Sequence, residues 1–270
     1  MAGLLVACGA VIGALAAVGW VVSVAQSAPN LDQLAARKPH PPTEIFAADG
    51  SLLGYVQSDT VFSYVAGNMI PERMRQAIVA IEDRRFWQHA ALDYQGIVRA
   101  GFKFVSTGGH ALQGASTLTM QLVDNVYMPL SIRKNRNLQY KIAQAKLALQ
   151  LAKRHSKQWI LDNYINDVPF GAVNGENAIG VGAAAQSFFD RPIWRLDLAQ
   201  MALLAGLPQS PTVYNPFKDP RAAKKRRHDV LQAMVSSHYI SQALADAVDR
   251  QGLQVHASRT YLAHQEPFVF

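Results

Sequence analysis

The chain has 270 residues, of which 50% are hydrophobic and 17% charged, and this balance excludes an intrinsically disordered protein. Its single cysteine, Cys8, excludes an internal disulfide framework and a zinc site built from cysteines. The formal net charge of +7 favours an acidic partner, such as nucleic acid, anionic lipid or a polyphosphate, without choosing among them.

The N-terminal stretch is free of charge. Residues 2–26 carry no Asp, Glu, Lys or Arg, and a helix of about 25 residues is long enough to cross a bilayer core of roughly 30 Å. The apolar run exceeds the core of a signal peptide, and no basic leader precedes it. We therefore predict a transmembrane anchor over residues 1–26. The Pro, Asn and Lys residues of 27–42 predict a linker.

The next stretch indicates a β-hairpin followed by helices. Between residues 43 and 64, two β-rich runs flank Ala-Asp-Gly-Ser at 48–51, which is a hairpin signal. An apolar stripe of Met74, Ala77, Ile78 and Ile81 then predicts a helix from Pro71. Further helices are predicted over residues 116–125, 138–154, 157–168, 180–189, 198–206 and 222–236.

Residues 82–100 carry the densest set of reactive side chains. They read Glu-Asp-Arg-Arg-Phe-Trp-Gln-His-Ala-Ala-Leu-Asp-Tyr-Gln-Gly-Ile-Val-Arg-Ala. If the segment stays helical, Glu82, Arg85, Phe86 and His89 share one face, which predicts a general base with a cation, a ring and an imidazole beside it. From these residues alone, a solvated charged helix start is the alternative.

A second motif, residues 113–125, reads Gln-Gly-Ala-Ser-Thr-Leu-Thr-Met-Gln-Leu-Val-Asp-Asn. A glycine-containing loop that enters a helix presents unpaired backbone N–H groups to an anion, and Ser116 and Thr117 add hydroxyl donors. The motif therefore predicts a phosphate site. An ordinary helix with a serine cap is the alternative.

A third motif is a polar stripe at helical spacing. Arg133, Arg136, Tyr140 and Gln144 follow one another along it, and Lys141 lies beside it. Cations in this arrangement can neutralise a diphosphate through charge-assisted hydrogen bonds. A solvated helix face is the alternative.

These motifs resemble the signatures of the peptidoglycan glycosyltransferases, the lipid II-polymerising domain of class A penicillin-binding proteins. The first resembles Glu-Asp-x-x-Phe-x-x-His-x-Gly-x-Asp-x-x-Gly-x-x-Arg-Ala, with Ala91 in place of a glycine. The second resembles Gln-Gly-Gly-Ser-Thr-Ile-Thr-Gln-Gln-Leu-x-Lys-Asn, with Met120 for a glutamine and Asp124 for the lysine. The third resembles Arg-x-Leu-x-Arg-Lys-x-x-Glu, with Tyr140 for the second arginine and Gln144 for the glutamate. Residues 156–171, 180–189 and 204–216 resemble the remaining signatures.

The resemblance implies a mainly α fold: a lysozyme-like glycosyltransferase head at residues 43–240, with a smaller membrane-proximal lobe behind the N-terminal transmembrane helix. Residues 241–270 are expected to form a C-terminal extension toward a missing or separate domain. Because no Ser-x-x-Lys centre with a transpeptidase context occurs, penicillin binding is not expected. The implied location is the bacterial cytoplasmic membrane, with a single pass and the catalytic domain on the outer side.

The implied reaction transfers a growing glycan from its undecaprenyl diphosphate to the 4-hydroxyl of lipid II. The resemblance implies that Glu82 is the general base and that Asp83 orients it. Since the amide of Gln144 carries no charge, leaving-group stabilisation would fall on cations or on a divalent metal such as Mg²⁺, for which we predict no protein ligand. The substrate-binding residues implied are Arg85, Phe86, His89, Gly114, Ser116, Thr117, Gln121, Arg136, Lys141 and Gln144.

Three functions stay open at this stage. The first is an active or slow lipid II polymerase, and the second is a degenerate relative that binds lipid II or wall-synthesis partners, such as a transpeptidase, without turnover. The third is a glycan hydrolase on the related fold, which lacks an assured second carboxylate. The apolar anchor, and a basic run at 221–227 without interleaved aromatic residues, argue against nucleic acid as partner.

Overall fold

The computed structural model describes residues 2–37, 44–55, 59–106, 116–129, 133 and 137–258, and this part of the chain is mainly α, as predicted. The helices are α1 (Ala2–Ser27), α2 (Glu72–Glu82), α3 (Tyr94–Ser106), α4 (Leu118–Val126), α6 (Leu138–Arg154), α7 (Lys157–Asp167), α8 (Gly180–Phe189), α9 (Leu198–Gly206), α10 (Pro220–Ser236) and α11 (Gln242–Asp249). The strands are β1 (Glu44–Phe46), β2 (Leu52–Tyr55), β3 (Thr60–Phe62), β4 (Pro169–Val173) and β5 (Glu176–Ile179), and short 3₁₀ turns are η1 (Leu31–Gln33), η2 (Gly67–Met69) and η3 (Ile193–Arg195).

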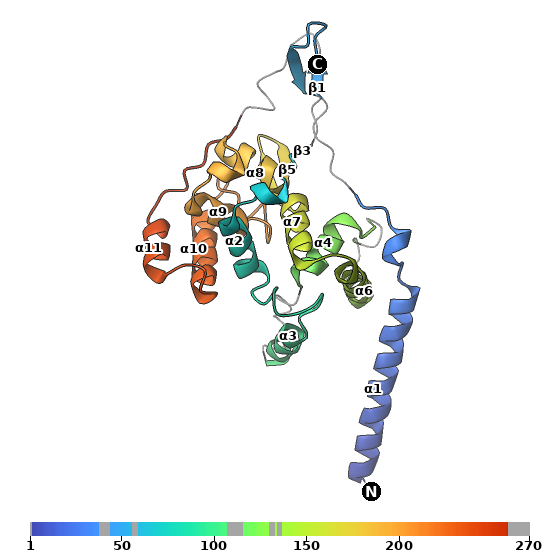
Figure 1. Ribbon diagram of the computed structural model, residues 1–270. Helices are drawn as coiled ribbons and strands as arrows, with labels where there is room; N and C mark the ends of the chain where they lie inside the picture. The colour runs from blue at the N-terminus through green and yellow to red at the C-terminus, as the bar shows by residue number, and fades with distance from the viewer. Residues whose placement is uncertain are drawn as a thin grey trace.

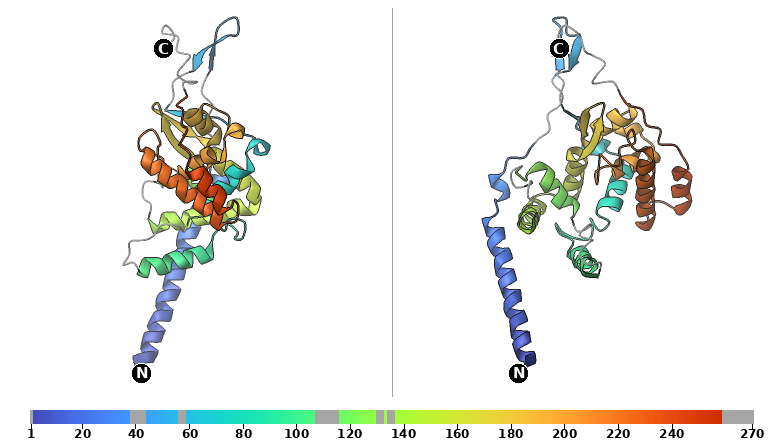
Figure 2. Two further views of the ribbon diagram at one scale, coloured as in Figure 1. Left: turned by 90° about the vertical axis from the view of Figure 1, so that its left-hand side faces the viewer. Right: turned by 180° about the vertical axis from the view of Figure 1, so that it is seen from behind.

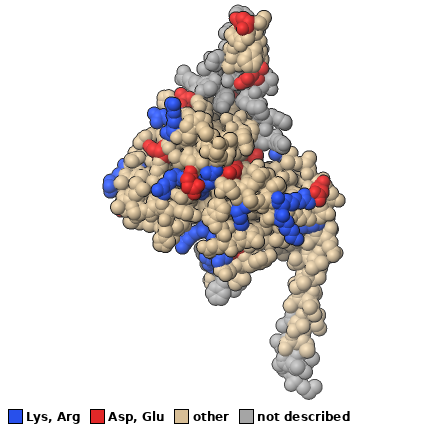
Figure 3. Space-filling model, in the orientation of Figure 1, with Lys and Arg blue, Asp and Glu red and all other residues tan. Residues whose placement is uncertain are grey.

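Helix α1 projects from the body of the molecule (Figure 1). Val11, Ile12 and Leu15 are each more than half exposed, and Figure 3 shows no charged side chain along the helix. By length and composition, it is long and apolar enough to cross a membrane. Its bounds agree with the predicted anchor to within one residue.

The first part of the predicted linker lies against the body. Leu31 is buried, and its backbone N–H donates to the side chain of Gln150 on α6. The Arg37 guanidinium donates to the carbonyl oxygens of Asp124 and Asn125, where a cation is favoured at the C-terminal end of α4. Residues 38–42 of the predicted linker lie outside the described residues.

The predicted hairpin is confirmed. Strands β1 and β2 pair in antiparallel fashion, with Glu44 opposite Tyr55, and Gly50 takes a positive φ of 83° in the turn. The hairpin extends away from the helices (Figure 2). A second sheet, in the order β3-β5-β4, was not predicted. Its β4–β5 turn contains Asn174 and Gly175, both at positive φ, and this Asn-Gly pair is the signal that sequence reasoning missed.

The predicted helices agree closely with the observed ones. The bounds of α6, α8 and α9 are those predicted. Helix α10 begins two residues earlier than expected because Asp219 accepts hydrogen bonds from two N–H groups of the first turn and Pro220 takes the first helical position. Helices α2, α9 and α10 pack against one another, and α4 packs against both α6 and α7. Met74 and Ile78 of the predicted stripe are fully buried between these groups.

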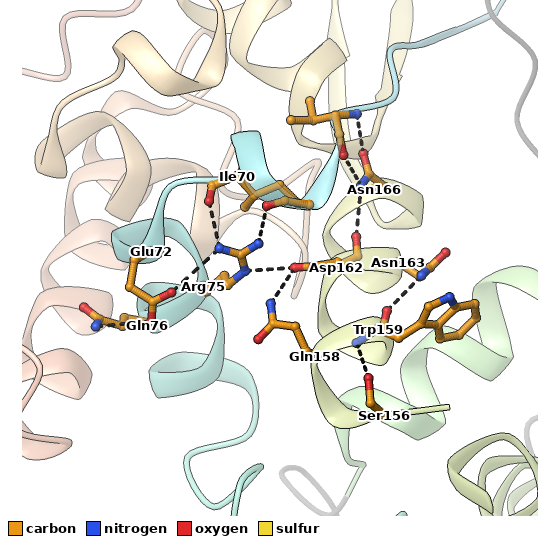
Figure 4. Close-up of polar contacts among 12 residues, drawn as sticks. Ile70, Glu72, Arg75, Gln76, Ser156, Gln158, Trp159, Asp162, Asn163 and Asn166 are labelled. Atoms are coloured by element: carbon orange, nitrogen blue, oxygen red, sulfur yellow. Dashed lines mark hydrogen bonds and ion pairs between the residues drawn. The ribbon is translucent and has the colours of Figure 1, made fainter. Parts of the chain in front are cut away.

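Two polar contacts tie the sheet and α2 to α7 (Figure 4). The buried amide of Asn166 accepts from the N–H of Val65 and donates to its carbonyl, at 2.9 and 3.0 Å, so this mid-helix amide is satisfied. The Arg75 guanidinium on α2 donates to Asp162 on α7 at 2.8 Å. These bonds fix α2, which ends in the candidate site, relative to α7.

The region beyond residue 240 also contacts the body. Helix α11 packs against α10, and the buried guanidinium of Arg227 donates to the carbonyl oxygens of Asp249, Gln251 and Gly252. The backbone of His256 bonds to the carbonyl of Phe188. The predicted extension is therefore packed onto the head through residue 258, and residues 259–270 lie outside the described residues.

Candidate active site

Helix α2 ends at Glu82, so the expectation of one helical face through His89 is wrong. Asp83 leaves the helix with φ −152° and ψ 73°, and the next helix begins only at Tyr94. The helix ends here because Asp83 makes tertiary contacts. The Asp83 carboxylate accepts the N–H of Leu118, at the start of α4, at 3.0 Å, and its other oxygen lies 2.8 Å from the ring Nε2 of His89. These bonds replace the helical continuation and leave Glu82 as the last residue of α2.

The Glu82 carboxylate is held on both sides. Its Oε2 accepts from the amide of Gln121 on α4 at 3.1 Å, and its Oε1 lies 3.5 Å from the guanidinium of Arg226 on α10. The Tyr164 hydroxyl in turn donates to Gln121 at 3.1 Å. Burial raises the pKa of Glu82 above its ordinary value, while Gln121 and Arg226 oppose that rise. The side chain is only 10% exposed.

A cleft of about 680 Å³ opens at this helix end. Glu82 and Asp83 line it, together with residues 236–239 beyond α10 and Ser116 and Thr117 before α4. Three arginines, Arg84, Arg85 and Arg99, also line the cleft, which therefore suits an anionic ligand.

The remaining predicted residues of the first motif hold the loop together. Phe86 is fully buried beneath the Lys157 ammonium, which lies 4.1 Å from the ring centroid. Arg85 forms an ion pair with Asp93. His89 is the partner of Asp83. Of these three side chains, Arg85 lines the cleft.

The spacing of Asp93 and Gly96 has a steric cause. The Asp93 carboxylate accepts the N–H of Gly96 at 2.8 Å, which caps the start of α3. A Cβ on residue 96 would lie 2.5 Å from the other carboxylate oxygen of Asp93, so a larger residue would displace the capping side chain from its present position.

The second motif begins α4 as predicted, with Thr117 rather than Ser116 as the cap. The Thr117 hydroxyl donates to the carbonyl of Ala91 and accepts the N–H of Met120, so its single proton is used within the protein. Ser116 accepts from the Lys141 ammonium at 3.1 Å. Gln121 contacts Glu82 instead of facing a phosphate. Gly114 lies outside the described residues.

Comparison with known proteins decides the family. A family model described as transglycosylase matches residues 49–235. The chain belongs to this family, the glycosyltransferases of class A penicillin-binding proteins. Penicillin-binding protein 1A of Aquifex aeolicus is 34% identical over 242 residues, which cover 90% of this chain and 32% of that protein. Penicillin-binding protein 1A of Escherichia coli is 34% identical over 228 residues, covering 84% and 26%.

A solved structure of penicillin-binding protein 1A from Haemophilus influenzae is also similar. The superposed region covers 83% of this chain and 22% of the solved chain, with 23% sequence identity and a TM-score of 0.48. The chain thus spans about a third or less of the length of the relatives it matches.

Four of the departures from the transglycosylase motifs lie between α4 and α6. The Tyr140 hydroxyl donates to the Asp124 carboxylate, which also forms an ion pair with Arg133 at 3.4 Å. One turn away, the Gln144 amide donates to the backbone carbonyl of Met120 at 3.0 Å and accepts from Lys141 at 3.0 Å. Asp124 and Tyr140 are therefore linked through their side chains, whereas Gln144 is bound to the backbone of α4. Arg136, predicted to bind substrate, lies outside the described residues.

The described residues do not fit a divalent metal on this side of the site. Within that part of the chain no three His, Cys, Asp or Glu side chains gather as a ligand set. The oxygen of Gln144 accepts a hydrogen bond from the Lys141 ammonium, and the positive charge of that group disfavours a metal ion at the same oxygen.

Two residues that contact the Glu82 cluster were not assigned to the site from sequence: Arg226, and Tyr164, whose fully buried side chain also belongs to the core. Arg226 is only 8% exposed and reaches Glu82 across 144 positions of sequence. A signal was present, because an arginine on an apolar helix face is rarely buried unless it is paired.

Proposed function

We propose that the protein is a membrane-anchored peptidoglycan glycosyltransferase that polymerises lipid II into glycan strands. One observation carries the proposal: the buried carboxylate of Glu82, held from two sides, opens onto an arginine-lined cleft. In this reaction Glu82 removes the proton of the acceptor 4-hydroxyl as that oxygen attacks the donor sugar.

The environment of Glu82 suits a general base. A base works best when its pKa lies near the working pH, and burial moves the pKa of Glu82 upward, in that direction. Asp83 uses both carboxylate oxygens on His89 and Leu118. We therefore assign Asp83 the task of fixing the end of α2, so that Glu82 keeps its position.

The diphosphate of the donor requires cations. Lys141 reaches the start of α4, where its ammonium contacts Ser116, and Arg84, Arg85 and Arg99 line the neighbouring cleft. Charge-assisted hydrogen bonds from these groups would stabilise the departing diphosphate without a metal.

The lipid substrate requires access from a bilayer. Figures 1 and 2 place α3 at the end of the body toward which the N-terminus of α1 extends. Around the cleft, Trp87, Tyr94, Ile97 and Val98 are exposed beside Arg84 and Arg99. An apolar surface with cations is typical of an element at the membrane interface. We propose that residues 1–26 are the membrane anchor, that residues 43–240 form the glycosyltransferase domain, and that the cleft lies on the outer side of the cytoplasmic membrane.

The test is polymerisation of labelled lipid II by the full chain in detergent, with product strands separated on a gel. We expect glycan strands whose formation needs no added divalent ion. If lipid II binds but no strands form under any metal condition, the protein is a binder and the transferase proposal fails. Release of free saccharide with chain shortening would instead indicate a hydrolase.

A further inference from the structure

We infer that Arg226 is a positioning residue for the proposed reaction: fixed by Gly206 and Tyr214, its guanidinium keeps the Glu82 carboxylate charged and aligned. The inference rests on the proposed function and extends it to α10, outside the motifs that contain the base.

Three contacts other than that with Glu82 hold the Arg226 side chain in place. Its Nε donates to the carbonyl of Gly206, the last residue of α9, at 3.0 Å. Its central carbon lies 5.4 Å from the centroid of the Tyr214 ring, within the range of a cation–π contact. Its aliphatic stem packs on Gly206, where an added Cβ would lie 2.8 Å from the Arg226 Cγ. Arg226 is therefore preorganised rather than drawn into place by the carboxylate.

The distance to Glu82 has a chemical consequence. The separation of 3.5 Å between Nη2 and Oε1 is long for a hydrogen bond, whereas the contact of Gln121 with Oε2 is 3.1 Å. A charge at that distance stabilises the carboxylate but does not saturate the lone pairs of Oε1. Oε1 is thus the oxygen that remains able to accept the acceptor proton.

The other groups around Glu82 cannot supply this charge. Within the described part of the chain, the charges that shift the pKa of Glu82 are those of Asp83 at the end of α2 and Arg226 on α10, and Tyr164 on α7 also lies beside it. Arg84, Arg85 and Arg99 line the cleft onto which Glu82 opens. Helix α4 contributes the neutral Gln121, and α9 contains no titratable residue. Asp83 disfavours the charged form of Glu82, so Arg226 is the cation that offsets both burial and Asp83.

The direct test is ¹³C NMR titration of the Glu82 carboxyl in the full chain, assigned with Glu82→Gln. Arg226→Met should raise the measured pKa by about one unit or more, since a lost opposite charge at this range shifts a carboxyl by 1–3 units. Gly206→Ala, which keeps the charge but displaces the stem, should raise it less. The control Arg221→Met, an exposed arginine on the same helix, should leave it unchanged.

Activity gives the second readout. The acid limb of the pH profile of kcat/KM should move upward in Arg226→Met by the same amount, with KM for lipid II unchanged and activity recovering at high pH. In Arg226→Lys, the acid limb should lie between those of wild type and Arg226→Met. If Arg226→Met does not fold, Arg226→Lys and Gly206→Ala test the inference in its place. An unchanged titration in the folded variants would overturn the inference. Because the titration needs no turnover, it still decides the role of Arg226 if wild type forms no glycan strands.

Discussion

The two sides of the candidate site are built in different ways. Around Glu82, most residues match the transglycosylase pattern, and they come from four helices, α2, α4, α7 and α10. Between α4 and α6, four residues depart from that pattern: the side chains of Asp124 and Tyr140 bond to each other, and Gln144 bonds to the backbone carbonyl of Met120. The residues around Glu82 thus match the pattern, whereas this group departs from it.

This difference has a physical basis. A buried polar side chain that changes alone leaves its partner unsatisfied, at a cost of about 1–3 kcal/mol, whereas a paired change does not. Tyr140 supplies the hydroxyl that Asp124 accepts, and Gln144 supplies the amide for the carbonyl of Met120. We therefore expect Asp124 and Tyr140 to respond to substitution as a pair, whereas the bond of Gln144 to a backbone carbonyl does not depend on the side chain at position 120.

Among substitutions of residues other than Glu82, the largest effect is expected at Lys141, whose ammonium contacts both Ser116 and Gln144. Lys141→Met removes the ammonium beside Ser116 and Gln144, and one preorganised charged contact to a developing anion is worth about 3–4 kcal/mol. We expect kcat/KM for lipid II to fall by roughly 10²-fold or more. Lys153→Met, an exposed lysine on the same helix, is the control and should be neutral. Equal activity in both variants would remove Lys141 from the site.

Gln144→Glu is expected to lower the stability of the fold, although it restores the residue of the family motif. The new carboxylate would face the carbonyl oxygen of Met120, 3.0 Å from the present amide nitrogen, and would lose that hydrogen bond. We expect the free energy of unfolding to fall by about 1–3 kcal/mol. Denaturant unfolding measures it, with the exposed Gln139→Glu as control. A more stable protein with faster turnover would show that the glutamate fits this site unaided.

On the Glu82 side, Gln121→Leu should lower kcat/KM at neutral pH by about tenfold. It removes the bond to Oε2, and a hydrogen bond to a charged group contributes about 1.5–3 kcal/mol. Tyr164→Phe removes only the hydroxyl that orients Gln121 and should cost a few-fold at most. The reverse order of these two variants would show that Gln121 does not act through Glu82.

The coupling between Asp124 and Tyr140 is expected to be about 1 kcal/mol, and a double-mutant cycle of unfolding free energies measures it. Asp124→Asn and Tyr140→Phe each weaken the same contact, so the double variant should be less destabilised than the sum of the two. Additive effects would mean that the two departures from the motif are independent.

The smallest effect concerns pH and stability. Since the folded-state pKa of Glu82 is raised, the ionised form is disfavoured in the fold, and stability is lost as pH rises from the unfolded-state pKa through the folded-state value. Glu82→Gln removes this loss. The melting temperature of the variant should match wild type near pH 4 and exceed it slightly at pH 8. A variant that is less stable at pH 8 would contradict the direction of the shift.

Much of the fold followed from sequence because the signals were local. Apolar periodicity and the turn at Gly50 each act within a few residues. The site followed only in part. The path of the chain after Glu82 depends on a bond between Asp83 and the start of α4, 35 positions away, and the contact of Arg226 spans 144. Local patterns contain no information about such pairings, so the expected helical face was wrong and Arg226 was missed.

Turnover of lipid II by Glu82→Gln tests most directly whether the carboxylate of Glu82 is the general base. The amide keeps the shape of the side chain but cannot take a proton, so kcat should fall by about 10²- to 10⁴-fold while lipid II binding and the circular dichroism spectrum stay as in wild type. Near-normal turnover in the folded variant would show that another group removes the acceptor proton.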